Sequence, residues 1–310
     1  MRVISDQEVA ELITMREAIA AMAAAFEQFG NGAGAIAPRV RVAAEHNRKT
    51  AMISTLGAAL PASGVVGAKI YSTVGDRFNF VIILFSARTG EPLAAIAANE
   101  ITRLRTAAAS AVALQRLARR DSRTLAIFGT GTQARAHAEA FLLAHAFERV
   151  LVAGRAGAPD FANWITTEFG VPAQPVDAAQ AAREGDVIAT CTRAVEPLFD
   201  GALIRPGAFV AAVGSSKPHA RELDDALLAR AELIVVEWLP AAQSEAGEFV
   251  RAGIGIIDDA LRQGRVVELG KLLVRGTRYE RRSDDVVIYK SVGVGLEDVA
   301  LANLVWRRLQ

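Results

Sequence analysis

The chain has 310 residues, of which 52% are hydrophobic and 22% charged, so it is long and apolar enough for two domains with buried cores. Its 35 Lys and Arg residues balance 34 Asp and Glu residues. The resulting formal charge of +1 argues against nucleic acid or another polyanion as a partner. The single cysteine, Cys191, excludes an internal disulfide and favours a reducing compartment.

Two observations argue against export and against a membrane span. The N-terminal segment MRVISDQEVAELI carries acidic residues where a signal peptide needs an uninterrupted apolar core. The longest uncharged stretch, residues 51–68, contains Pro61 and several glycines and is typical of strands and turns. We therefore expect a cytoplasmic protein with no membrane partner.

The first third of the chain predicts a small α+β domain. Ser5 with Glu8, and Thr14 with Glu17, each fit a capping box and predict two helices, the second ending at Gly30. The pattern then changes to short β-type runs, which predict a mostly antiparallel sheet. These runs occupy residues 40–43, 51–55, 68–73 and 80–86.

The rest of the chain predicts a doubly wound α/β fold. Residues 99–118 predict a long Ala-rich helix. Beyond it, buried-strand patterns alternate with helical segments such as residues 222–229, as in a parallel sheet with helices on both faces. A last helix ends at Trp306. The expected strands lie at residues 125–128, 150–153, 187–192, 209–213, 233–237 and 286–289.

The segment TLAIFGTGTQARAH, residues 124–137, predicts a dinucleotide site. Gly129, Gly131 and Ala134 form a G-x-G-x-x-A pattern between an apolar run and a helix-forming segment. The first glycine permits a tight turn, the second lets the backbone approach a pyrophosphate, and the small third residue lets helix and strand pack closely. An ordinary glycine-rich turn is the alternative.

The end of the next strand bears on the choice of cofactor. An acidic residue there would bind the ribose 2′-OH of NAD, whereas an arginine accommodates the 2′-phosphate of NADP. The chain has Gly154 and Arg155 there and no carboxylate until Asp160. NADP(H) is therefore favoured over NAD(H), unless Arg155 is only a solvated loop charge.

Three basic residues outside the nucleotide fold have apolar neighbours in sequence: Arg39, Lys69 and Arg105. Each alone is typical of an edge-strand or snorkelling side chain. Together with the glycine turn, however, the motifs that contain them form a series: APR, GAK, TGEPLA, LRTAAAS, FGTGTQA and SVGVGLED. This series resembles the ornithine cyclodeaminase/μ-crystallin family over nearly the whole chain.

The resemblance implies a Rossmann domain at residues 118–289 and a substrate-binding, dimerising domain at residues 1–117, completed by residues 290–310. It also implies a homodimer. The family's activities share NAD(P)-dependent chemistry at the Cα–N bond of a small α-imino or α-amino acid. They include ornithine cyclodeaminase, alanine dehydrogenase and ketimine or Δ1-pyrroline-2-carboxylate reductase.

The family's carboxylate-binding and catalytic basic positions match Arg39, Lys69 and Arg105. An arginine offers a planar fork for a carboxylate, and a confined lysine beside two guanidiniums has its pKa lowered toward the range useful for proton transfer. Cys191 reads as a buried small hydrophobe rather than a nucleophile. The implied cofactor-binding residues are Gly129, Thr130, Gly131, Thr132, Gln133, Ala134, Gly154, Arg155, Thr190, Cys191, Thr192, Val213, Gly214, Ser291, Val292 and Gly293.

Two departures from the cyclodeaminase pattern bear on the substrate. Cyclodeaminases carry acidic residues at the positions of Thr50 and Ser216, which would line the substrate site here. Holding a second ammonium without a counter-charge is costly, so ornithine is disfavoured. The segment GSSKPHARELDD is closer to the ketimine-reductase branch.

The leading hypothesis is therefore NADPH-dependent reduction of Δ1-pyrroline-2-carboxylate or Δ1-piperideine-2-carboxylate to proline or pipecolate. The alternatives are ornithine or lysine cyclodeamination, alanine-dehydrogenase-type reductive amination, and a non-catalytic μ-crystallin-like protein that binds NADPH. The four histidines show no metal-ligand spacing, so no metal site is expected. Asp76, Asn79, Glu297 and Asp298 match family-like positions, where helix capping or dimer contacts explain them equally well; Asp298 is also a candidate active-site residue.

Overall fold

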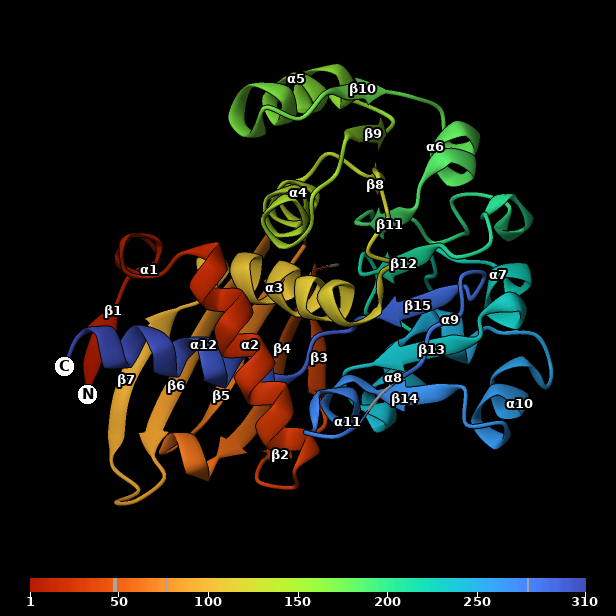
Figure 1. Cartoon of the computed structure of the whole chain (residues 1–310). Coiled ribbons are helices and arrows are strands. Elements are labelled where there is room, and N and C mark those ends of the chain that lie inside the picture. Colours follow the sequence, from red (N-terminus) through yellow and green to blue (C-terminus); the bar gives the residue numbers. More distant parts are fainter. Residues whose placement is uncertain (47–48, 76, 278) are drawn as a thin grey trace. The chain divides into compact units, whose positions relative to one another are not determined.

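The computed structural model describes residues 1–46, 49–75, 77–277 and 279–310, which divide into two compact units (Figure 1). Unit 1 comprises Met1–Ala109, Leu273–Gly276 and Gly293–Gln310. Unit 2 comprises Ser110–Leu272 and Thr277–Val292. Helices and strands contribute to both units, which confirms the predicted α/β class.

Unit 1 is built on a seven-stranded sheet within the described residues, in the order β1-β7-β6-β5-β4-β2, with β3 paired to β4. The neighbouring strands from β2 to β7 all pair antiparallel, as the sequence predicts. The short β1 pairs parallel to β7, which the sequence does not reveal. The strands are β1 (Arg2–Ile4), β2 (Ala35–Ile36), β3 (Val40–His46), β4 (Lys49–Leu60), β5 (Val65–Val74), β6 (Arg77–Ser86) and β7 (Pro92–Ala97).

Two helices of unit 1, α1 and α2, begin where the sequence provides caps. In both predicted capping boxes, at Ser5 and Thr14, the cap side chain accepts from the N–H of a glutamate three residues on, and that glutamate accepts from the cap's own N–H. The helices α2 and α12 pack on one face of the sheet (Figure 1). The helical segments are α1 (Asp6–Leu12), α2 (Met15–Gly30), η1 (Pro61–Ser63), α12 (Gly295–Arg308) and the first part of α3 (Asn99–Leu117).

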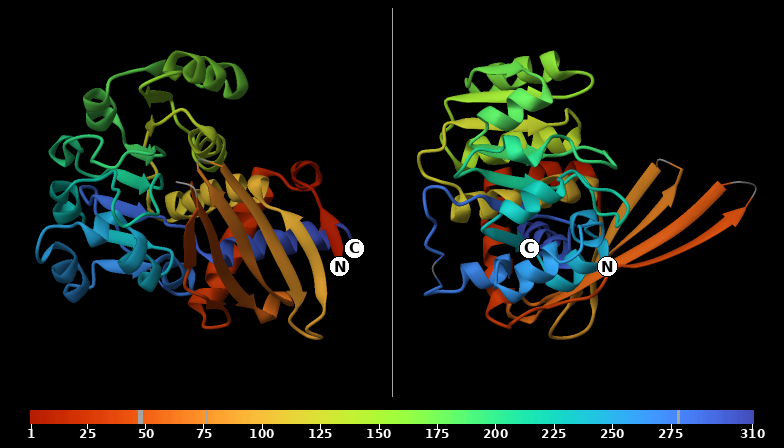
Figure 2. Two further views of the ribbon diagram at one scale, coloured as in Figure 1. Left: turned by 180° about the vertical axis from the view of Figure 1, so that it is seen from behind. Right: turned by 90° about the vertical axis from the view of Figure 1, so that its right-hand side faces the viewer.

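The two faces of the unit 1 sheet differ in their environment. Along β5, Lys69 and Tyr71 are buried on the face that α12 covers, whereas Ile70 alternates to the other face and is exposed. In the view from behind, the strands form the nearest layer of unit 1 (Figure 2). We call that side the exposed apolar face; by strand register it carries Val40, Val42, Ile53, Ile70, Val74 and Val81, which are 36% to 61% exposed.

Unit 2 contains an eight-stranded sheet among its described residues, in the order β10-β9-β8-β11-β12-β15-β13-β14, with every pair parallel. Its central strands are buried on both faces, as their continuous apolar runs predict. The doubly wound sheet is thereby confirmed. The strands are β8 (Thr124–Phe128), β9 (Arg149–Ala153), β10 (Ala173–Pro175), β11 (Val187–Thr190), β12 (Phe209–Ala212), β13 (Leu233–Val236), β14 (Val266–Glu268) and β15 (Val287–Lys290).

The predicted helix at residues 222–229 is wrong at its start. Helix α7 begins at Asp225, because the Asp224 side chain caps it by accepting from the Leu227 N–H. Glu222 lies outside the helix in a buried loop. The helical segments of unit 2 are α4 (Thr132–Ala144), α5 (Ala158–Phe169), α6 (Ala178–Glu184), η2 (Gly201–Leu203), α7 (Asp225–Arg230), α8 (Leu239–Glu245), α9 (Gly247–Val250), α10 (Ile256–Arg262) and α11 (Leu269–Leu273).

A close approach in unit 1 gives a test of this packing. A Cβ added at Gly295, the first residue of α12, would overlap the backbone of Gly57 in β4. The Gly295→Ala substitution must displace backbone, and we expect it to lower the free energy of unfolding by about 1–3 kcal/mol. Urea denaturation measures this loss. Arg307→Ala, at the exposed end of the same helix, should change stability by less than about 0.5 kcal/mol, and equal losses would contradict the packing described.

Candidate active site

A cluster of buried charges lies between the covered sheet face and α12. The Nζ of Lys69 (β5) is 2.8 Å from Oδ1 of Asp298. Arg105, from α3, places Nη1 2.5 Å from Oε2 of Glu297 and Nε 3.3 Å from Oδ1 of Asp298. Arg39, just before β3, donates from Nη2 to the carbonyl oxygen of Gly293 at 2.7 Å. The structure thus brings the three predicted basic residues into one network of unit 1, which we call the basic cluster.

The two carboxylates of this basic cluster come from the first turn of α12. Glu297 and Asp298 have no exposed surface. Negative side chains are favourable at a helix N-terminus, where the unpaired N–H groups concentrate positive potential. Because α12 starts in close contact with β4, its first turn delivers both carboxylates to the sheet. The open question about Asp298 is answered in geometric terms: it is an ion-pair partner of both Lys69 and Arg105.

Lys69 has the most altered acid–base chemistry in the cluster. The residue is 2% exposed, and its Nζ lies 5.4 Å from the centre of the Phe80 ring. Burial lowers its pKa from 10.5 to about 8; Asp298 opposes this change, while Arg105 and Arg39 add to it. A lysine with this pKa can gain or lose a proton near neutral pH, which suits general acid–base chemistry.

Gly293 makes room for the guanidinium of Arg105. Its φ of +75° is in the left-handed region, and a Cβ there would overlap Nη1 of Arg105. Only glycine meets both conditions without strain. Gly293 therefore lies at the basic cluster of unit 1, not in the cavity of unit 2 that contains most of the other predicted cofactor residues.

The two remaining predicted substrate residues, Thr50 and Ser216, lie outside the basic cluster. Thr50 is exposed in β4, with its hydroxyl 3.4 Å from Oε1 of Glu45 on β3. Asn79 is exposed in β6, and Ser216 belongs to unit 2, after β12. Asp76 lies outside the described residues.

Unit 2 contains a cavity of about 1160 Å³ at the carboxyl ends of β8, β9, β11 and β12. This is the edge of a doubly wound sheet where ligands bind. The predicted residues that line it are Gly129, Thr130, Gly131, Thr132, Gln133, Gly154, Arg155, Cys191, Thr192, Val213 and Gly214.

The glycine turn fits a dinucleotide pyrophosphate. Gly129 has a φ of +107°, and a Cβ there would lie 2.6 Å from the carbonyl oxygen of Cys191, so the turn needs a glycine. At Gly131, directly before α4, a Cβ would meet no atom within 4 Å, so the backbone faces open space. The N-terminus of α4 thus offers N–H groups to an anion in the cavity.

Four other predicted cofactor residues, Ala134, Thr190, Ser291 and Val292, do not line the cavity. Ala134 and Thr190 are fully buried behind the lining, and Ser291 and Val292 are held by the buried carboxylate of Glu237. Asp177, the N-cap of α6, also lines the cavity, which sequence reasoning missed. Burial, and next the charge of Glu222, raise the pKa of the Cys191 thiol, which is the environment of an inert cysteine.

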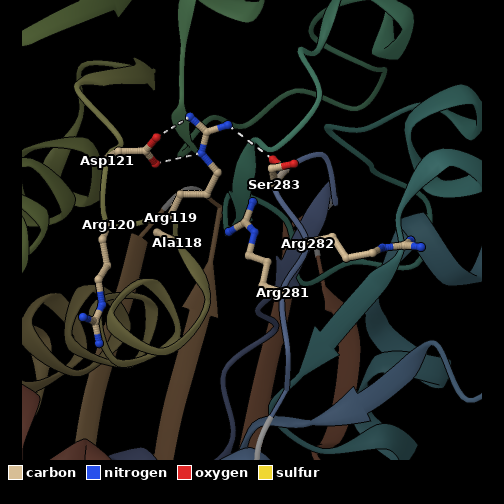
Figure 3. A pocket seen from close by; sticks show the side chains of 7 residues that line it. All are labelled: Ala118, Arg119, Arg120, Asp121, Arg281, Arg282 and Ser283. Atoms are coloured by element: carbon tan, nitrogen blue, oxygen red, sulfur yellow. Dashed lines mark hydrogen bonds and ion pairs between the residues drawn. The ribbon is translucent and has the colours of Figure 1, made fainter.

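A second cavity of about 400 Å³ in unit 2 contains several arginines, of which Arg119, Arg281 and Arg282 donate to carboxylate or carbonyl oxygens (Figure 3). Arg119 bonds Asp121 and the carbonyl oxygen of Ser283, while Arg120 points away from that pair. Arg281 donates to the backbone carbonyls of Leu117, Gly207, Ala208 and Asp285. These contacts anchor the loop before β15, and we assign no ligand to the cavity.

The described part of the chain offers neither a metal cluster nor a membrane span. In the described ranges, no group of three or more His, Cys, Asp or Glu side chains is arranged to hold a metal ion. His137 is buried between Ser110 and the carbonyl oxygen of Gln133, and burial lowers its pKa to about 4. No described helix combines the length and apolar character needed to cross a bilayer.

A doubly wound unit with a dinucleotide-type turn, together with an α+β unit that holds buried cations, defines a two-unit NAD(P)-dependent oxidoreductase. The model of the ornithine cyclodeaminase/mu-crystallin family matches residues 1–310. The chain belongs to this family, which confirms the resemblance found in the sequence.

Three relatives show how closely the chain follows the family. A Δ1-pyrroline-2-carboxylate reductase of Bacillus cereus is 33% identical over 322 residues, covering 99% of this chain and 96% of its own. A probable ornithine cyclodeaminase from Bordetella pertussis Tohama I is 44% identical with a TM-score of 0.92, and the match covers 100% of this chain and 97% of that one. The Thermococcus litoralis Δ1-pyrroline-2-carboxylate reductase, in complex with NADH and L-proline, is 28% identical with a TM-score of 0.90, covering 99% and 97%.

The ion pair in the basic cluster predicts how the pKa of Lys69 responds to mutation. Because Asp298 raises that pKa, Asp298→Asn should move it below about 8. A ¹³C NMR titration of the lysine Cε signals measures it, with Lys69→Arg to assign the peak. Glu297→Gln, which removes a carboxylate paired with Arg105, should change the pKa of Lys69 less. An unchanged Lys69 titration in Asp298→Asn would rule out the pair as described.

Proposed function

We propose that this protein is an NADPH-dependent reductase of a cyclic ketimine carboxylate, either Δ1-pyrroline-2-carboxylate or Δ1-piperideine-2-carboxylate, forming L-proline or L-pipecolate. The carrying observation is the basic cluster, in which two guanidiniums adjoin a buried lysine with a pKa of about 8. We further propose that unit 1 binds the substrate and unit 2 the dinucleotide.

The charges of the basic cluster suit a substrate with one carboxylate. Arg39, Lys69 and Arg105 contribute three positive charges, while Glu297 and Asp298 contribute two negative ones, which leaves this set at +1. One substrate carboxylate would balance the set. Arg39 and Arg105 are the proposed carboxylate ligands, since a guanidinium offers two parallel N–H donors to the two oxygens.

Lys69 is the proposed source of the proton. Reduction adds a hydride to C2 of the imine and leaves the nitrogen with one more proton, so a donor is needed near that nitrogen. The Lys69 ammonium can supply it, directly or through a water, and Asp298 holds the lysine in position. The nicotinamide cofactor, when bound, supplies the hydride.

The activity is tested with purified protein and a panel of five- and six-membered cyclic imino acids. We expect NADPH oxidation with at least one of them, and loss of at least about a hundredfold in kcat/KM for Lys69→Met, since general acid catalysis contributes about 10²–10⁴-fold. Absorbance at the reduced nicotinamide band reports the rate. If the protein binds NADPH normally and oxidises none of it with any imine, the proposal fails.

Ornithine cyclodeamination is the second candidate, because the relative at 44% identity is described as a probable ornithine cyclodeaminase. Thr50 and Ser216 argue against it, since neither supplies a counter-charge for a second ammonium group. The two activities separate in one assay. Cyclodeamination would release ammonia from ornithine without net formation of reduced cofactor, whereas imine reduction consumes NADPH and releases no ammonia.

Arg155 is the proposed determinant of cofactor choice. It is exposed at the end of β9 and lines the cavity of unit 2, where it could pair with a 2′-phosphate. Arg155→Ala should weaken NADPH binding by about 10- to 100-fold, the worth of one charge-assisted contact, and leave NADH binding unchanged. Titration calorimetry with both nucleotides measures this. Arg149→Ala, at the other end of β9, is the control; an equal loss for both nucleotides in Arg155→Ala would exclude the role.

We also propose that the exposed apolar face of unit 1 pairs with a second copy of the chain. Its six large apolar side chains extend across four strands, and a contiguous patch of this kind is typical of an interface. Val42→Asp, opposite Ile53, should convert a dimer to monomer in light scattering coupled to gel filtration. Val3→Asp, on β1 at the other edge of the sheet, should leave it dimeric although Val3 is more exposed than Val42, at 76% against 61%. A wild-type monomer would refute the pairing.

A further inference from the structure

A buried carboxylate lies directly behind the lining of the cofactor cavity. Glu222 has no exposed surface, yet its two oxygens accept four hydrogen bonds of 2.7 Å. Oε1 accepts from the N–H and the hydroxyl of Thr192, and Oε2 from the Thr190 hydroxyl and the Gly214 N–H. A carboxylate can accept all four, whereas a neutral amide of the same shape cannot.

These bonds join the ends of two neighbouring strands. Thr190 ends β11, and its register partner Ala212 ends β12, so Thr192 and Gly214 both lie just beyond the sheet's carboxyl edge. Both residues line the cavity. The contact leaves no spare room, because a Cβ at Gly214 would overlap Oε1 of Glu222. The shape of this part of the cavity therefore depends on Glu222.

The charge of Glu222 is only partly compensated within its own network. Its N–H donates to Oε1 of Glu248 at 2.9 Å, and Oε2 of Glu248 is 3.0 Å from Nζ of Lys290, at the end of β15. Glu248 and Lys290 are each 1% exposed. Glu222 and Glu248 contribute two negative charges and Lys290 one positive charge, which leaves this buried set at −1. The negative charge of Glu222 also acts on a lining residue, because together with burial it raises the pKa of Cys191.

We propose that Glu222 is a positioning residue for the nicotinamide end of the cofactor, and that its charge makes the cavity favour the oxidised nucleotide over the reduced one. The oxidised ring carries one positive charge that the reduced ring lacks, so a buried anion behind the lining stabilises the oxidised form selectively. While the nucleotide is bound, this bias shifts the equilibrium of hydride transfer toward the oxidised cofactor and the reduced imine. The inference rests on the proposed function in requiring a nicotinamide dinucleotide in this cavity.

The test compares the dissociation constants for NADP⁺ and NADPH, measured by calorimetry, in the wild type and in variants. Glu222→Gln should weaken NADP⁺ binding about tenfold more than NADPH binding, since it removes the charge. Glu248→Gln removes a charge further from the lining, so it should shift the ratio of the two dissociation constants in the same direction but by less. The Glu248→Gln variant also tests the inference if Glu222→Gln does not fold. Thr192→Val removes the two hydrogen bonds of the Thr192 hydroxyl, to Glu222 and from the Ala194 N–H, but keeps the charge of Glu222, so it should weaken the binding of both nucleotide forms equally.

Asp186→Asn is the matched control. Asp186 is also a buried carboxylate between two strands, but it accepts from the N–H groups of Arg123 and Thr124 at the opposite edge of the sheet. The Asp186→Asn variant should lose thermal stability but keep the wild-type ratio of the dissociation constants for NADP⁺ and NADPH. An unchanged ratio in Glu222→Gln, or an equal shift in Asp186→Asn, would overturn the inference alone. A wild type that binds neither nucleotide would instead overturn the proposed function, and this inference with it.

Discussion

Two carboxylates buried in the first turn of α12 constrain the rest of unit 1. Glu297 and Asp298 have no contact with solvent, and an uncompensated buried charge costs several kcal/mol. The fold must therefore bring cations to them, and it takes Lys69 from a strand and Arg105 from a helix. Gly295 and Gly293 are necessary to this arrangement, one to seat the helix on the sheet and one to leave room for a guanidinium.

Both units use buried carboxylates beside their proposed ligand sites, but with opposite net charge. The basic cluster of unit 1 carries a net +1 and suits a small anion. The Glu222 network of unit 2 carries −1 behind a cavity that suits a ring whose oxidised form is a cation. Low-dielectric surroundings strengthen both effects. In our proposals, substrate anchoring and cofactor bias therefore both depend on the net charge of a buried cluster.

The sequence reveals local signals well and non-local pairing poorly. The capping boxes at Ser5 and Thr14, and the turn around Gly129, depend on residues a few positions apart, so they could be identified. The family resemblance is likewise confirmed. Asp298 lies 229 residues from Lys69, and a first-turn acid looks the same whether it caps a helix or pairs with a buried lysine. Sequence spacing puts Glu222 in a helix because its neighbours have helical periodicity, and nothing local shows its burial. Strand alternation likewise cannot show which sheet face a helix covers.

The central claim is that the basic cluster recognises a carboxylate, and it is tested most directly with two ligands that differ only in that group. Titration calorimetry of the protein saturated with NADP⁺ would compare L-proline with L-prolinamide. The account predicts that L-proline binds and that L-prolinamide binds at least about a hundredfold more weakly, the scale of a lost charge-assisted, bidentate contact. Equal affinity for the two ligands would contradict it.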